Sequence, residues 1–166
     1  PSKIIIGKNA SKDFDFSDDS LVITSPGAKK RGWLDYLGIK NFMIYDNVES
    51  NPSIDTAIKI IDEFSDEKIS TVIGLGGGSC LDVSKFVAHK LKKQKILIPT
   101  TFGSGSEVTR ISVLKVDDKK QSFHDDELFA DIALVDSHFI EDTPDDIFKN
   151  SVIDSIAQCS EGFDSK

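Results

Sequence analysis

The chain has 166 residues, of which 20 are Lys or Arg and 28 are Asp or Glu, so its formal net charge is −8. This length suits one domain with a full core and is too short for two ordinary domains. Such an acidic chain has no general attraction to nucleic acid or anionic lipid, and none of its apolar runs is long enough to span a membrane. We therefore expect a cytoplasmic protein with no nucleic-acid partner and no membrane partner.

Short apolar runs rich in Ile and Val alternate with longer polar stretches along most of the chain. They cover residues 4–6, 21–23, 42–45, 72–75, 95–98 and 132–135. This alternation is typical of buried parallel strands joined by helices. The predicted fold class is α/β, a Rossmann-like and mainly parallel sheet flanked by helices.

Four further elements are predicted between and after these strands. Apolar spacing indicates a helix over 57–64, with Ser53 or Asp55 as its N-cap, and a second helix starting near Ser79. Residues 111–116 and 121–123 flank a polar turn at 117–120 and predict a β-hairpin insertion. After Pro144 the pattern becomes helical over 151–163. We assign residues 1–150 to an α/β domain and 151–166 to the start of an all-helical domain, which favours a piece of a longer protein.

A run of three glycines follows the fourth predicted strand and opens a predicted helix. Residues 76–85 read GGGSCLDVSK. Glycines at such a junction allow positive φ and let a phosphate approach the N-terminus of the helix. The spacing matches neither GxGxxG nor the Walker pattern. A tight turn without a ligand is the alternative, with Asp82 as a helix-capping acid.

A second loop, dense in hydroxyl groups and glycine, follows the fifth predicted strand. Residues 98–109 read IPTTFGSGSEVT. Such a loop can bind a ribose, a phosphate or an amide, although surface loops favour the same residues. Asp136 ends the last strand and is a candidate cap for the next turn. The three histidines stand alone, without a metal ligand at helical spacing, which favours structural or surface roles.

These segments together resemble the iron-containing (group III) alcohol dehydrogenase family, from Asp46 to the last residue. In that family the glycine loop reads GGGSxxDxxK, and residues 76–85 match every fixed position. The resemblance implies that Gly77, Gly78 and Ser79 hold the diphosphate of a dinucleotide, with Asp82 near its nicotinamide side.

The second loop also matches the family, and the resemblance implies that it contacts the dinucleotide through Thr100, Thr101, Ser104 and Thr109. Lys120 falls where the family places a lysine that reaches a cofactor ribose or the reacting end. A solvated charge in a hairpin turn is an equal alternative for Lys120.

The loop after the second strand bears on the choice of cofactor. Family members often place an acid there to receive the adenosine ribose hydroxyls, whereas this chain has Ser25, followed by the basic residues 29–31. A carboxylate repels a 2′-phosphate, and a hydroxyl with nearby cations accepts one. We predict NAD(P) as cofactor, with NADP(H) slightly favoured. The alternative is that the basic residues only line the exposed start of a helix.

The family binds iron or zinc through an Asp and a His four residues apart on one helix, and through two later His residues. Asp154 matches the Asp, and Gln158 stands at the His position. An amide oxygen is a poorer ligand than imidazole for these metals. The resemblance implies that Asp154 and Gln158 belong to a divalent-metal (Fe or Zn) site that is completed only in the full-length protein.

The function implied is that of a metal-dependent alcohol dehydrogenase or aldehyde reductase. Hydride would pass between a small alcohol or aldehyde and NAD(P), with the metal as Lewis acid. This chain would be the nucleotide-binding half, with no catalytic residue beyond the metal ligands, and a homodimer is compatible with the family. Two alternatives remain: a relative of dehydroquinate synthase or glycerol-phosphate dehydrogenase, and a module that binds cofactor without turnover.

Overall fold

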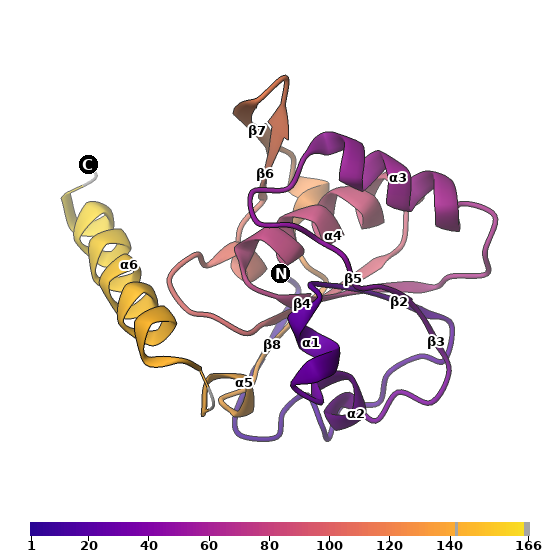
Figure 1. The fold of residues 1–166 in the computed structure, drawn as a ribbon, viewed down its shortest axis with the longest axis horizontal. Helices are drawn as coiled ribbons and strands as arrows, with labels where there is room; N and C mark the ends of the chain where they lie inside the picture. Colours follow the sequence, from indigo (N-terminus) through magenta and orange to yellow (C-terminus); the bar gives the residue numbers. More distant parts are fainter. Residues whose placement is uncertain (142, 165–166) are drawn as a thin grey trace.

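Six parallel strands form the central sheet in residues 1–141 and 143–164, which the computed structural model describes (Figure 1). Their order is β1-β8-β5-β4-β2-β3, and every pairing is parallel. The strands are β1 (Lys3–Ile6), β2 (Ser20–Thr24), β3 (Phe42–Tyr45), β4 (Thr71–Gly76), β5 (Gln94–Pro99) and β8 (Ile132–Val135). All six predicted strands are confirmed, each within one residue at either end.

Helices cover both faces of the sheet (Figure 1). One face carries α3 (Ile54–Phe64) and α4 (Gly78–Leu91), and the other carries α1 (Gly27–Lys30), α2 (Trp33–Leu37) and α5 (His138–Glu141). Because side chains alternate along a strand, Leu21 and Ile23 of β2 join the core beneath α3 and α4, while Val22 joins the opposite core. The near-continuous apolar runs of β2, β4 and β5 thus reflect strands buried on both faces.

The helix starts follow local capping rules. Ser53 is the N-cap of α3, because its side chain accepts a 3.2 Å hydrogen bond from Thr56 N, so Ser53 rather than Asp55 holds that role. Helix α4 begins at Gly78, one residue before the predicted Ser79, and Gly77 is its N-cap. No side chain of the described residues caps α4.

The predicted hairpin is present as β6 (Ile111–Val116) and β7 (Lys119–His124), but its turn is shorter than expected. Asp117 and Asp118 form a two-residue turn, with φ of 47° and 61°. Asp tolerates this left-handed conformation, which matches the twist of two antiparallel strands. Lys120 consequently lies in a strand, not in the turn.

Helix α6 (Asp145–Asp164) begins six residues before the predicted start at 151. Pro144 precedes it, and Asp145 and Asp146 occupy its first turn, where acidic side chains favour a helix start. The helix extends away from the sheet (Figure 1), and its Ile153 and Ile156 are each 64% exposed. In the described part of the chain, no helix has the length and apolarity needed to cross a membrane.

Asp136 closes the carboxyl end of β8. Its buried carboxylate accepts hydrogen bonds from His138 N at 3.0 Å, Asn9 N at 3.0 Å, Ser11 N at 2.9 Å and Tyr36 OH at 3.0 Å. The bond from His138 N is the predicted cap. The other three tie β8 to the segment after β1 and to α2, so Asp136 joins parts of the fold that are distant in sequence.

Candidate cofactor-binding site

The glycine loop lies at the carboxyl end of β4, where the order of strands changes direction between β2 and β4. Gly76 has φ +152°, and a Cβ there would lie 2.7 Å from Cys80 Sγ, so only glycine fits. The uncapped N-terminus of α4 follows directly. Ligands of open α/β sheets bind at such a reversal, and a helix N-terminus attracts anions.

The second loop packs against the glycine loop from the end of β5. Thr100 N donates a 3.0 Å hydrogen bond to Gly76 O. A Cβ added to Gly77 would lie 3.1 Å from Thr101 Oγ1, and one added to Gly78 would lie 3.1 Å from Ser104 Cβ. The predicted hydroxyl groups of Thr101 and Ser104 therefore border the glycines. The two loops predicted separately from sequence are thus in direct contact.

Asp82 is not a capping acid, because it is the fifth residue of α4 and its carboxylate binds groups of other segments. One of these is Ser106, in the short helix η1 (Ser106–Val108). The hydroxyl of Thr109 accepts a 3.4 Å hydrogen bond from Lys85 Nζ and lies 3.4 Å from Ser106 O. The Thr109 hydroxyl group is thus bound to protein groups. Burial lowers the pKa of Lys85, against the opposing effect of the Asp82 charge.

A cavity of about 160 Å³ brings together Ser79, Asp82 and Lys120, three predicted residues from two separate elements. Asn51, which the sequence interpretation missed, lines the same cavity and donates a 3.4 Å hydrogen bond from its main chain to Ser79 Oγ. Asn51 has φ +52°, a conformation that Asn tolerates better than most residues. The sequence signal that could have pointed to Asn51 is an Asn directly before Pro52, in the loop after β3.

Ser25 lies at the other side of the strand reversal. It lines a cavity of about 570 Å³ together with Glu49, Asp55 and Lys59. Glu49 Oε1 accepts a 2.6 Å hydrogen bond from Thr56 Oγ1 and thereby holds the start of α3. The basic residues 29–31 are not among those lining this cavity, and Arg31 lies 5.0 Å from the Trp33 ring.

Cys80 lies behind the glycine loop as a buried thiol. Burial raises its pKa to about 11, and a hydrogen bond with Ser25 opposes that effect. The thiol is therefore protonated at neutral pH and serves as a packing group beneath Gly76.

The two predicted metal residues face the second loop from α6. Gly103 has φ +114°, and a Cβ there would collide with the carboxylate of Asp154. Gln158 lines a cavity of about 220 Å³ with Thr101 and Gly103. Among the described residues, no group of three or more His, Cys, Asp or Glu side chains could hold a metal ion. A carboxylate and an amide alone do not make a complete site for iron or zinc.

The histidines lie outside these loops. His89 Nδ1 is 3.1 Å from Glu127 Oε2, in a cavity of about 1000 Å³ at the amino ends of β5 and β8. The helix η2 (Asp126–Leu128) contributes that glutamate. His138 stacks on Tyr36 with ring centroids 3.6 Å apart. Both placements agree with the structural or surface roles expected from the sequence.

The fold and the two loops at the strand reversal define a doubly wound α/β domain of the nucleotide-binding class. Comparison with known proteins gives the family. The model of the family "Iron-containing alcohol dehydrogenase" matches residues 1–137. The chain therefore belongs to the iron-containing alcohol dehydrogenase family and corresponds to its NAD-binding, Rossmann-like part.

Individual relatives agree with this assignment. Long-chain-alcohol dehydrogenase 1 of Geobacillus thermodenitrificans is 34% identical over 86% of this chain and 43% of that protein. The iron-containing alcohol dehydrogenase of Thermotoga maritima superposes with a TM-score of 0.88 at 27% identity, over 98% of this chain and 54% of that one. Sulfoacetaldehyde reductase of Bifidobacterium kashiwanohense, in complex with NAD+, gives 0.91 at 26% identity, over 100% of this chain and 52% of that one. The chain thus spans about half the length of these relatives.

Proposed function

We propose that the chain binds NAD(P)(H) across the carboxyl ends of β2, β4 and β5. The diphosphate would lie on Gly77, Gly78 and Ser79, at the N-terminus of α4, with the hydroxyl groups of the second loop beside it. One observation carries this proposal: the two loops approach so closely at an uncapped helix N-terminus that Gly77 and Gly78 leave no room for a Cβ without a shift. Main-chain N–H groups and small hydroxyls are suited to a diphosphate.

The remaining predicted residues lie on either side of the proposed diphosphate position, towards the nicotinamide end and towards the adenosine end. Lys120 and Asp82 border the cavity at Ser79, which we assign to the ribose and nicotinamide side. Ser25 borders the cavity that we assign to adenosine. Thr100 is buried and holds the glycine loop through its main chain, so its contribution is to the shape of the site.

We propose that the whole protein transfers a hydride between a small alcohol or aldehyde and this cofactor. Bound NAD(P) would accept or donate the hydride, and the residues of this chain would bind and orient it. Asp154 and Gln158 would be this chain's share of a divalent-metal site, on a helix that begins a second, helical unit. The family assignment favours this activity over that of a dehydroquinate synthase. The incomplete ligand set favours cofactor binding without turnover for residues 1–166 alone.

Titration with NADH and NADPH, followed by nicotinamide fluorescence and combined with metal analysis of the same sample, tests the proposal. We expect saturable binding of at least one cofactor, with substoichiometric metal. If neither cofactor shows saturable binding, the glycine and hydroxyl loops do not form a functional site in this chain, and the proposal is wrong.

The preference for NADP(H) is a separate proposal that depends on Ser25. We expect Ser25→Asp to raise the ratio of the NADPH dissociation constant to the NADH dissociation constant by about tenfold or more. The new carboxylate would repel the 2′-phosphate and accept the ribose hydroxyls of NAD(H). Ser25→Ala, which adds no charge, is the matched control. An unchanged ratio in Ser25→Asp would place the adenosine ribose elsewhere.

A further inference from the structure

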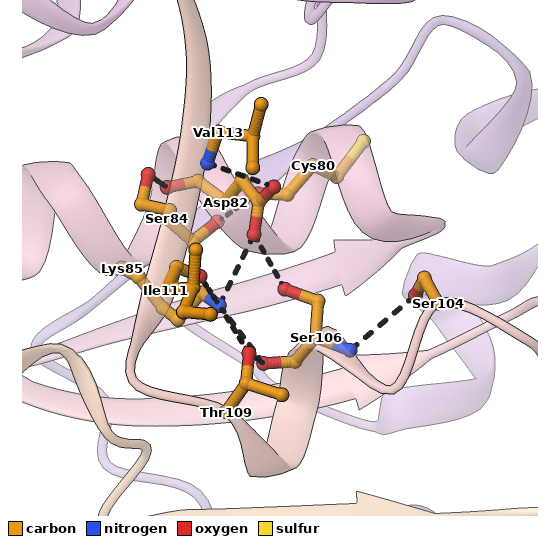
Figure 2. Close-up of polar contacts among 10 residues, drawn as sticks. Cys80, Asp82, Ser84, Lys85, Ser104, Ser106, Thr109, Ile111 and Val113 are labelled. Carbon is orange, nitrogen blue, oxygen red and sulfur yellow. Dashed lines mark hydrogen bonds and ion pairs between the residues drawn. The ribbon is translucent and has the colours of Figure 1, made fainter. Parts of the chain in front are cut away.

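Asp82 and Lys85 lie one turn apart on α4, and both side chains reach the segment between the second loop and β6 (Figure 2). Asp82 Oδ1 accepts a 2.5 Å hydrogen bond from Ser106 Oγ, and Asp82 Oδ2 accepts a 3.1 Å hydrogen bond from Val113 N. Both oxygens of the carboxylate are therefore bound to protein groups. The Asp82 side chain is only 14% exposed, although it borders the cavity at Ser79.

The ammonium group of Lys85 is completely buried and has a full set of acceptors (Figure 2). Lys85 Nζ donates to Ser106 O at 2.9 Å and to Ile111 O, and it forms a 3.1 Å ion pair with Asp82 Oδ1. Thr109 Oγ1 is a fourth, weaker acceptor at 3.4 Å. An ammonium has three N–H groups, so these acceptors account for all of them. Nζ is the only polar atom of the Lys85 side chain, and it is therefore not exposed to solvent.

A buried charge imposes a conformation on its surroundings, because each lost partner leaves part of the charge unsatisfied in a medium of low dielectric. Two acceptors of Lys85 are main-chain carbonyls, at Ser106 and Ile111. These lie at the two ends of the segment that leaves the second loop and enters β6. Lys85 therefore fixes both ends of this segment, and Asp82 adds a second bond at the first end, to the Ser106 side chain.

The same segment continues into the wall of the proposed diphosphate site. Ser104 lies two residues before Ser106, and Ser106 N donates a 3.4 Å hydrogen bond to Ser104 Oγ. Ser104 borders Gly78, the first residue of the helix that carries Asp82 and Lys85. A shift of the segment at Ser106 would thus move Ser104 relative to the glycine loop.

We propose that Asp82 and Lys85 form a positioning pair, which holds the second loop at the separation from the glycine loop that the dinucleotide requires, without touching the cofactor. This inference rests on the proposed function and gives Asp82 a different role from that of a direct nicotinamide contact. It also assigns a role to Lys85, the last fixed position of the glycine-loop pattern.

The test combines two measurements on the chain and on its Lys85→Met variant, which keeps the length of the side chain and removes its charge. Hydrogen exchange without cofactor reports the order of residues 104–113. Nicotinamide fluorescence reports the dissociation constant of whichever cofactor the native chain binds. We expect exchange in residues 104–113 to accelerate at least about tenfold, and binding to weaken by about tenfold or more.

Ser84→Ala is the matched control, because Ser84 is completely buried between Asp82 and Lys85 in sequence and its hydroxyl bonds only within the helix, to Cys80 O at 2.7 Å. We expect it to leave exchange in residues 104–113 and cofactor binding unchanged. If Lys85→Met does not fold, the double variant Asp82→Asn with Lys85→Met leaves no unpaired charge and takes its place with the same expected results.

The outcomes separate the two proposals. Weaker binding with native exchange in residues 104–113 would mean that the pair acts on the cofactor directly, which would overturn the inference. Faster exchange with unchanged binding would also overturn it, because the loop's position would not matter to the ligand. If the native chain binds neither cofactor, the proposed function fails and the inference fails with it, whereas the other two results leave the proposed function intact.

Discussion

Replacement of Asp136 by alanine is expected to lower the free energy of unfolding by about 3 kcal/mol. The change removes a buried acceptor and leaves three main-chain N–H groups without their partner, while the Tyr36 hydroxyl keeps only Asn9 Oδ1 at 3.1 Å. Urea unfolding at neutral pH measures the effect. Asp66→Ala, at an exposed position of the same residue type, is the control and should change stability little. An unchanged urea midpoint in Asp136→Ala would mean that these donors are satisfied by water.

The same carboxylate should make stability depend on pH in a defined direction. Burial alone would raise the pKa of Asp136, but the hydrogen bonds from His138, Ser11, Tyr36 and Asn9 outweigh it and lower the pKa. The stabilisation is therefore complete above the unfolded pKa of about 3.9 and is lost as the pH falls through the lower folded value. The stability difference between the native chain and Asp136→Asn should shrink over that acidic range. A constant difference would contradict the assignment.

Tyr36 gives a smaller and independent check of this cluster. Burial and the hydrogen bond to Asp136 raise the pKa of Tyr36 to about 12. Tyr36→Phe removes one of the four hydrogen bonds, so we expect a loss of only about 1 kcal/mol.

Gly78→Val is expected to weaken cofactor binding about 100-fold, or about 2.7 kcal/mol, with a much smaller effect on folding. Gly78 is helical, so valine can adopt its backbone conformation, and the effect is steric. The added Cβ would lie 3.1 Å from Ser104 Cβ, and the two methyl groups beyond it would occupy the space between the loops. Titration with NADH and NADPH measures the loss.

Gly7→Val is the matched control for that substitution, because a Cβ at Gly7 meets no atom within 4 Å. It should bind cofactor as the native chain does. Native affinity in Gly78→Val would show that the diphosphate does not lie between the two loops, even if the chain binds a dinucleotide.

The central strands β2, β4 and β5 could be predicted because they are buried on both faces, so that the middle of each is a continuous apolar run. The edge strand β1 is also rich in Ile, although most of its residues are exposed. The turn of the hairpin could not, since Asp117 and Asp118 look like solvated loop residues and reveal their left-handed conformation only when the strands on either side are paired. The start of α6 was missed because residues 145–150 carry a weak apolar pattern. Their acidic first turn and the preceding Pro144 were the better signal.

The two loops could be recognised from their sequence, but which of their residues bind other protein groups could not be predicted. Asp82 and Ser106 are 24 positions apart, and Asp82 and Val113 are 31 apart. Only the fold brings these residues together. From the sequence alone, an Asp82 that binds other parts of the protein could not be distinguished from an Asp82 that binds the cofactor. Asn51 was missed for the same reason, because its relation to Ser79 depends on how α3 and α4 pack.

The order of the strands sets when each part of the sheet can form. Strand β1 is an edge strand whose partner is β8, and Lys3 pairs with Ile132. Nearly the whole chain must be available before this contact can close, and contacts so distant in sequence slow folding. Asp136 adds to this constraint by binding the main chain of residues 9 and 11. On a ribosome, we expect β1 to join the sheet only after β8 has been synthesised.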